Sequence, residues 1–256
     1  MAIVLGIGRA IAALSPRRSI VFAFWDAEED GYAGSEYYAN TDPLVPVDSI
    51  VTFLNWDIQG ANLLPSLRDI SFAIGAETGG ENLQRAVDRA VENEGLDVRS
   101  ISEVLGQCRS DHANFCGTPL VFFSDANNGC YHTNGDEIKA LDFGKLEKQA
   151  RIGLKLAHEL ASTERPPSHR YSLIPVSFSD AKTIQEVANR AVENDLALFD
   201  SYDQELLKGA LSELNCIVDS TSFFFLFNVL RFLSATGSLV DVLSRTECSG
   251  YLLEEA

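Results

Sequence analysis

Short apolar runs alternate with amphipathic segments along residues 2–160. The runs are rich in β-branched and aromatic residues, which indicates buried strands, and we expect these at residues 19–25, 50–54, 69–75, 98–104 and 118–124. The intervening segments suit helices and lie at residues 2–14, 34–39, 82–93 and 143–160. Alternating strands and helices predict an α/β fold, with a three-layer αβα arrangement around a mostly parallel mixed sheet.

Residues 163–172 change in character, with paired prolines among polar neighbours and no periodicity, and predict a linker. Residues 173–256 then form a helical C-terminal region, with helices expected at 180–198, 203–218 and 222–243, the last broken near Gly237. The phenylalanine cluster at 223–227 is far shorter than the ~20 apolar residues that a membrane span requires. We therefore divide the chain into a domain of residues 1–162, a linker and a helical appendage in which no motif indicates chemistry.

Carboxylates follow the first of these strands. Asp26, Glu28 and Glu29 come directly after the apolar run, and the carboxyl ends of strands in an open α/β sheet border its ligand crevice. Neighbouring side chains on an extended backbone diverge, so one of the two glutamates can hold a metal while the other accepts a proton. An isolated Glu-Glu pair is more often surface charge in the first turn of a helix, so its interpretation depends on whether other strand ends carry matching residues.

Two further strand ends do carry such residues. Asp57 comes after the strand expected at 50–54, and His132 lies in the loop after the strand expected at 118–124. Glu29, Asp57 and His132 together make a mixed carboxylate–imidazole set of the kind that binds zinc. A lone histidine after a strand is usually a loop residue, so the set carries more weight than any of its members.

Five short motifs, in order, carry a resemblance to a known family. They are Trp25-Asp-Ala-Glu-Glu29, Gly34-Ser35, Asn55-Trp-Asp57, Ser110-Asp-His112 and Tyr131-His-Thr133. Across residues 2–162 the chain thereby resembles metallopeptidase family twenty-eight, which includes zinc aminopeptidases and glutamate carboxypeptidases. The resemblance implies a zinc exopeptidase-like fold and the hydrolysis of peptide substrates.

The resemblance also implies roles for individual residues. Glu28 is then the general base, Glu29 is a ligand of one zinc ion and Asp57 is a ligand of the other. His132 is implied to bind the same zinc as Glu29. Tyr131 resembles the family's residue beside that histidine and is implied to position the substrate or the oxyanion.

Asp111 and His112 look like organisers of their loop and not like ligands. The family's two other ligands, a His and an Asp that bridges two zinc ions, precede the helix expected at 2–14, and this chain has no His before His112. Three ligands are therefore implied, without the bridge that holds two cations ~3.5–4 Å apart, and we expect one bound zinc ion or none. We interpret the chain as a peptidase catalytic domain cut at its amino end.

This interpretation has a consequence for association. The family's early strands pair beside the strand expected at 19–25, and residues 1–16 show no strand pattern. An apolar strand edge left open favours pairing with another chain. We therefore expect the polypeptide made alone to be oligomeric or poorly soluble.

Charge and cysteine content narrow the picture further. The net charge of −17 argues against a nucleic-acid partner, because phosphate binding relies on clustered Lys and Arg. The five cysteines lack the CxxC spacing of zinc ribbons, and for Cys108, Cys116 and Cys130 a mutual disulfide and buried free thiols are both open. No signal peptide is visible at residues 1–14, yet the family resemblance implies export to the periplasm, the surface or the medium.

Three functions from different classes remain. The first is an exopeptidase-type zinc hydrolase, with aminopeptidase and carboxypeptidase specificity both open. The second is a non-catalytic binding module, because transferrin receptors and nicastrin resemble the family without its activity. The third is a transferase similar to the glutaminyl cyclases, although their Glu-Glu surroundings differ from those of this chain. We favour the first, because Glu28, Glu29, Asp57 and His132 are all present.

Overall fold

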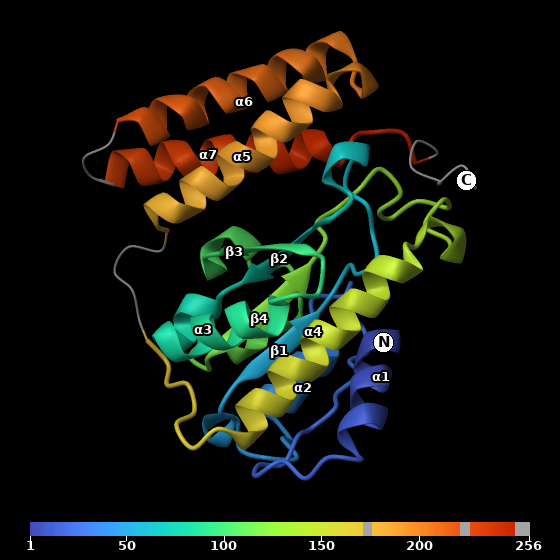
Figure 1. The fold of residues 1–256 in the computed structure, drawn as a ribbon, viewed down its shortest axis with the longest axis vertical. Helices are drawn as coiled ribbons and strands as arrows, with labels where there is room; N and C mark the ends of the chain where they lie inside the picture. The colour runs from blue at the N-terminus through green and yellow to red at the C-terminus, as the bar shows by residue number, and fades with distance from the viewer. Residues whose placement is uncertain (171–175, 221–225, 249–256) are drawn as a thin grey trace.

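The computed structural model describes residues 1–170, 176–220 and 226–248. Figure 1 shows a central sheet with helices on both of its faces. The first part of the chain contains α1 (Ala2–Ile11), α2 (Ala33–Asn40), β1 (Phe53–Trp56), β2 (Ile70–Ile74), α3 (Gly80–Val91), β3 (Asp97–Ile101), β4 (Leu120–Ser124) and α4 (Phe143–Ser162). Three further helices come after these, namely α5 (Phe178–Asn194), α6 (Ser201–Asp219) and α7 (Leu226–Leu243).

The strands of the described residues lie in the order β1-β4-β2-β3. β1 pairs parallel with β4, and β2 pairs parallel with β3, whereas β2 and β4 run antiparallel. The sheet is therefore mixed, and the predicted fold class is confirmed. Because β1 and β4 are parallel and Trp56 lies opposite Phe123, the segments that follow these two strands begin side by side at the carboxyl ends of the strands.

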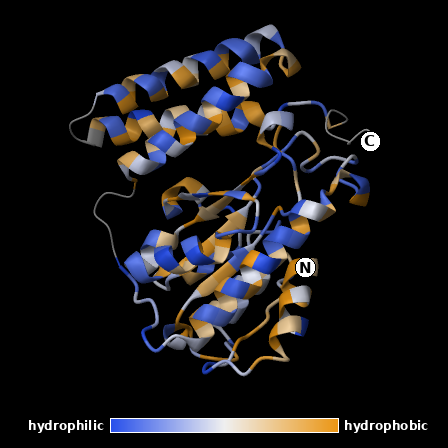
Figure 2. Ribbon diagram, in the orientation of Figure 1, coloured by the Kyte–Doolittle hydropathy of each residue, from blue (hydrophilic) through white to orange (hydrophobic). Residues whose placement is uncertain are grey.

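Alternation along β4 divides the core between the two faces of the sheet, because successive side chains on a strand point to opposite sides. Val121 and Phe123 pack with residues of α3 and α4. Phe122 lies on the other face and shares a core with residues of α5, α6 and α7. The C-terminal helices thus form the second helical layer (Figure 1), and Figure 2 shows the apolar residues gathered on the strands between the layers. The predicted domain division remains a prediction, but the core crosses it.

Helix α5 begins at a capping box. The Ser177 hydroxyl accepts from the Asp180 N–H at 3.2 Å, and the Asp180 carboxylate accepts from the Ser177 N–H in return. The same carboxylate accepts from the N–H and the hydroxyl of Ser102, at 2.9 and 2.7 Å. Because Ser102 directly follows β3, the cap that starts the helix also ties it to the sheet.

The last helix differs from its sequence prediction. The break expected near Gly237 is wrong, since α7 is continuous from Leu226 to Leu243. A glycine costs a helix only about 1 kcal/mol, and burying one large apolar side chain such as Phe232 or Leu239 outweighs that at roughly 1.5–3 kcal/mol. The start predicted at residue 222, and residues 223–225 of the phenylalanine cluster, lie outside the described residues.

The apolar segment 19–25 is not a strand, contrary to the sequence prediction. A strand needs hydrogen-bond partners for its amides, and within the described chain this segment has no backbone bond to the neighbouring edge strand β1. It is held by other contacts instead. The Arg18 guanidinium donates to the Thr163 carbonyl at the end of α4, at 2.6 Å, and Ile20 packs on a cluster formed with α1 and α4. Phe24 is left 44% exposed.

A disulfide joins Cys130 to Cys248. Its second half lies outside the three cysteines among which the sequence left a disulfide open. The remaining cysteines, Cys108, Cys116 and Cys216, are free and exposed. The loop after β4 is therefore linked covalently to the segment after α7. In the segments that the structure describes, no helix has the length and apolar character needed to cross a membrane.

Candidate active site

A tight turn displays Glu28 and Glu29. Tyr32 adopts the left-handed backbone region with φ 62°, which is uncommon for a residue other than glycine, and its N–H donates to the Glu28 carbonyl at 2.8 Å. Gly34 is required where the chain crosses itself, because a Cβ there would lie 2.5 Å from the Asp26 carbonyl oxygen. The turn leaves Glu28 half-buried and Glu29 exposed.

Asp111 fastens this turn to the loop that precedes β4. The buried Ser35 hydroxyl, near the start of α2, donates to Asp111 Oδ1 at 2.6 Å, and the Asn114 amide donates to Ser35 at 2.9 Å. Beside it, the Asn55 amide of β1 donates to the Ser110 hydroxyl at 2.8 Å. The loop therefore holds both α2 and β1. Burial raises the pKa of Asp111, and the bond from Ser35 opposes that rise.

Asp57 stands at the carboxyl end of β1. Its N–H donates to the Phe123 carbonyl at 3.2 Å, and the next residue, Ile58, accepts from the Asp125 N–H at 2.8 Å. The ladder between β1 and β4 thus continues for two residues beyond the strands. The side chain of Asp57 is half-buried and lines the same cavity as Glu28 and Glu29.

A buried ion pair between Asp125, a residue of that ladder, and Lys145 stabilises this part of the site. The Asp125 carboxylate, which is fully buried, accepts from the Ala61 N–H at 2.9 Å and from the Gln149 side chain at 2.7 Å. It also lies 3.2 Å from Lys145 Nζ, which donates to the Ala61 carbonyl at 2.6 Å. Because Lys145 and Gln149 belong to α4 and Ala61 belongs to the loop after β1, the pair fixes that loop to the helix layer.

His132 and Glu29 meet at the open side of the site. His132 Nε2 lies 2.8 Å from Glu29 Oε1, with both side chains largely exposed. The Tyr131 ring stacks on the His132 ring with centroids 3.8 Å apart, which limits the orientation of the imidazole. The two residues that the resemblance assigns to one zinc ion therefore lie in contact, from loops 103 residues apart in sequence.

Crowded carboxylates set the electrostatics. Burial, followed by the charges of Asp57, Glu29 and Asp111, raises the pKa of Glu28 to about 7, whereas His132 opposes these effects. Burial also raises the pKa of Asp57, with Glu29 as an additional cause. Such a concentration of negative charge favours a bound cation.

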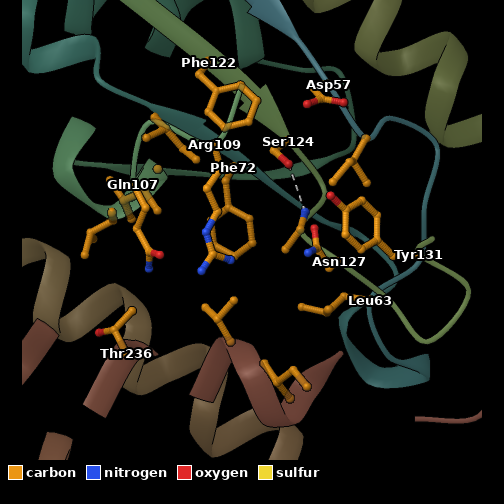
Figure 3. Close-up of a pocket in the computed structure, with 18 of the residues that line it drawn as sticks. Asp57, Leu63, Phe72, Gln107, Arg109, Phe122, Ser124, Asn127, Tyr131 and Thr236 are labelled. Carbon is orange, nitrogen blue, oxygen red and sulfur yellow. Dashed lines mark hydrogen bonds between the residues drawn. The ribbon is translucent and has the colours of Figure 1, made fainter. Parts of the chain in front are cut away.

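A cavity of about 470 Å³ begins at these side chains and continues between the sheet and the C-terminal helices. Glu28, Glu29, Asp57 and Tyr131 are among its lining residues. Figure 3 shows Asp57 and Tyr131 on one side of it and Thr236, from α7, on the opposite side. The volume falls in the ~300–1,000 Å³ range of small-molecule sites.

The sequence did not indicate most of that lining. Arg109 lies beside the Ser110-Asp-His112 motif, and nothing in the sequence pattern indicates a function for it. Its side chain reaches the cavity (Figure 3). Residues of α5 and α7, such as Val187 and Leu239, line the cavity as well. Their helical spacing is the same as that of ordinary core residues, so no sequence signal separates an apolar residue facing a sheet from one facing a cavity.

His112 lies apart from the group. Its ring is buried and stacks on Phe122 with centroids 4.5 Å apart, and neither ring nitrogen has a hydrogen-bond partner among the described residues. Burial lowers its pKa to about 4, so the ring is neutral near pH 7. It packs beneath the loop and does not line the cavity.

The donor set fits zinc only in part. Carboxylate and imidazole are ligands that zinc prefers, and Glu29 and His132 converge. A catalytic zinc ordinarily takes three protein ligands, and within residues 1–170, 176–220 and 226–248 no group of three His, Cys, Asp or Glu side chains is close enough to hold a metal ion. Asp57 lines the same cavity but does not complete such a group.

Comparisons with known proteins agree with the motifs. The chain is 26% identical over 166 residues to leupeptin-inactivating enzyme 1 of Streptomyces exfoliatus, a match that covers 54% of this chain and 34% of that enzyme. Two crystal structures of LapA from Legionella pneumophila, one described as an aminopeptidase, superpose with a TM-score of 0.54 at 20% identity, over 64% and 63% of this chain and 46% of theirs. The chain thus spans about a third of the length of the Streptomyces enzyme and less than half of LapA.

The family model described as peptidase family M28 matches residues 1–157. That range contains Glu28, Glu29, Asp57, Tyr131 and His132, together with the four strands of the described residues. It ends within α4 and leaves α5, α6 and α7 outside the match. The chain belongs to peptidase family M28.

Proposed function

We propose that this chain carries the site of a zinc-dependent, aminopeptidase-like hydrolase that removes residues from the end of a peptide. One observation carries the proposal. Glu28, Glu29, Asp57 and Tyr131, which come from three separate loops, line a single cavity, and His132 contacts Glu29 at 2.8 Å. The three loops are far apart in the sequence, so it is the fold that brings these residues together. The family match covers all five residues.

The chain's own residues suggest how the site works. Glu28 stands half-buried at the cavity, where its carboxylate takes a proton from the attacking water and returns it to the leaving amine. Glu29 and His132 would hold one zinc ion, and Asp57 would be a ligand of the other in the family's two-zinc arrangement; a bound zinc ion would supply a Lewis acid that polarises the scissile carbonyl. The carboxylates suit a cationic amino terminus better than a carboxyl terminus, which supports the aminopeptidase alternative.

Substitution of Glu28 tests the proposal. Glu28→Gln keeps the shape and removes the base, so hydrolysis of aminoacyl p-nitroanilides should be lost while the zinc content per chain, measured by mass spectrometry, is unchanged. Glu29→Ala and His132→Ala should instead lower the zinc content. Glu36→Gln, an exposed glutamate in α2, is the matched control and should change neither quantity. Full turnover by the Glu28→Gln variant would refute the role of Glu28.

A second candidate function is a non-catalytic binding module. It is favoured by one observation, the lack of a three-donor group among the described residues. It predicts a chain that binds peptide without zinc and without turnover of any aminoacyl substrate. Cyclisation of a peptide with an amino-terminal glutamine, assayed in parallel, tests the transferase alternative.

The compartment is also a proposal. The Cys130–Cys248 disulfide supports a location outside the reducing cytosol, because disulfides persist in oxidising compartments. We therefore infer an extracytoplasmic or secreted protein. Alkylation of the protein in intact producing cells would test this, since a reduced Cys130 in the native source would contradict it.

A further inference from the structure

The cavity has a chemically distinct second end. Away from the acidic residues, its sheet side is formed by apolar residues of β2 and β4, including Phe72, Ile74 and Phe122. Its opposite side is formed by α5 and α7. The six residues that these two helices contribute are Ile184, Val187, Thr236, Leu239, Val240 and Leu243. Since none of them is charged, this wall suits an apolar group and offers no ion-pair partner.

The wall is held at both ends of α5. At the start of α5, the Asp180 carboxylate accepts from Ser102 at 2.7 and 2.9 Å. At its end, the Asp195 carboxylate accepts from the N–H and the hydroxyl of Ser66, in the loop before β2. The helix therefore cannot move away from the sheet without breaking buried or part-buried hydrogen bonds.

The wall is also held at the end of α7. Cys248, five residues after that helix, is bonded to Cys130, two residues before His132. The cavity is thus bounded by a helix layer that is attached to the sheet and to the loop of the candidate site. A pocket formed before its ligand arrives costs less ordering on binding.

We propose that α5 and α7 form the wall of the pocket that receives a large apolar side chain of the peptide substrate, and that these helices set the size of the side chain the site accepts. The inference rests on the peptidase function proposed above. It assigns a role to a region that lies outside residues 1–157, the range of the family match. Side-chain selection then depends on this chain's C-terminal helices in addition to the shared domain.

Val240 offers the cleanest test. It lines the cavity and is only partly buried, so a larger side chain can enter the pocket without disrupting the core. Val240→Phe should lower the ratio of kcat/KM for phenylalanyl over alanyl p-nitroanilide by about tenfold or more, because each methylene in such a pocket is worth ~10–200-fold. Val240→Leu, a smaller change, should give a smaller shift in the same direction.

Leu230→Phe is the matched control. Leu230 lies on the same helix but is 60% exposed and does not line the cavity, so the ratio should stay as in the unmodified chain. Unfolding midpoints of all variants in urea establish that each is folded. An unchanged ratio in both Val240 variants would overturn the inference.

A binding measurement separates this inference from the proposed hydrolysis. Calorimetric titration with phenylalanine amide and alanine amide needs no turnover, and Val240→Phe should weaken the first selectively. Binding that depends on Val240 in a chain without any hydrolysis would support the pocket and overturn the hydrolase. Turnover that prefers a glutamyl substrate, and loses that preference in Arg109→Gln, would overturn the pocket and leave the hydrolase standing.

Discussion

Cys130 and Cys248 are joined by a disulfide across 118 residues of sequence. Cys130 lies two residues before His132, and Cys248 lies beyond the last helix of the chain's second helix layer. One covalent bond therefore connects the candidate zinc-ligand loop to the helices that wall the cavity. Because α5, α6 and α7 share a core with the sheet, the disulfide joins two segments that the packing of this core already holds close to each other.

Removing this disulfide should destabilise the folded chain. A cross-link restricts the unfolded chain, and bonds of this kind typically contribute about 2–4 kcal/mol. Cys248→Ser should lower the free energy of unfolding by an amount in that range, measured in urea under oxidising conditions. Cys216→Ser, which changes a free and exposed cysteine, is the control. If reductant leaves the unfolding midpoint of the unmodified chain unchanged, the bond does not contribute to stability.

Replacing Lys145 should be still more costly. Lys145→Met leaves the fully buried Asp125 carboxylate without its cation 3.2 Å away, and an uncompensated buried charge costs about 3–5 kcal/mol. Lys148→Met removes a lysine of the same helix whose Nζ bonds the Gly95 carbonyl at the surface, so it should cost far less. Equal losses of unfolding free energy in the two variants would show that the buried pair has no special role.

Stability should depend on pH through Glu77. Burial raises its pKa from 4.5 to about 7, with the Asp180 and Glu103 charges as further causes, although the Glu103 N–H bond to Glu77 at 2.7 Å opposes the rise. The folded chain therefore holds a proton that the unfolded chain releases between pH 4.5 and about 7. Stability is fully present below 4.5 and is lost as the pH rises through that window.

Glu77→Gln should remove this dependence. The amide oxygen can still accept from the Glu103 N–H. The free energy of unfolding of the variant, relative to that of the unmodified chain, should therefore rise from pH 5 to pH 8 by an amount on the order of 2 kcal/mol. His112, with a pKa lowered to about 4, makes stability fall in the acid direction in both proteins and cancels in the comparison. Glu92→Gln, at an exposed position, is the control. A difference between the two proteins that is the same at both pH values would contradict the assignment.

Self-association is expected at the sheet edge formed by β1. That strand forms one edge of the described sheet, and in the segment that precedes it in the chain Val21, Phe22 and Phe24 are 44%, 37% and 44% exposed. Unpaired edges and exposed apolar side chains favour pairing between chains. Sedimentation velocity should therefore show association that grows with concentration, and Phe24→Glu should reduce it.

Phe143→Glu provides the comparison for that experiment. Phe143 is 60% exposed at the start of α4, so the same chemical change is made away from the edge. Association should persist in this variant. A single monomeric boundary for the unmodified chain at all concentrations would contradict the expectation.

Much of the fold could be predicted from local pattern. β2 and β4 lie within two residues of their predicted bounds, because a short apolar run buried on both faces is a strong strand signal. The segment 19–25 is also rich in β-branched and aromatic residues, but the strand prediction there was wrong, because a strand exists only where another strand bonds to it. The start of α5 differs by two residues from its prediction, because the capping box at Ser177 and Asp180 sets it.

The sequence by itself determined the family and the chemistry of the acidic loops, since motifs and residue types are local properties. It named Glu28, Glu29, Asp57, Tyr131 and His132 without any distance between them. Only the tertiary structure decided that His132 contacts Glu29, that Cys130 bonds to Cys248, and that α5 and α7 close the cavity. The reason is physical: an amphipathic helix encodes which of its faces is apolar, but the surface on which that face packs depends on the whole chain.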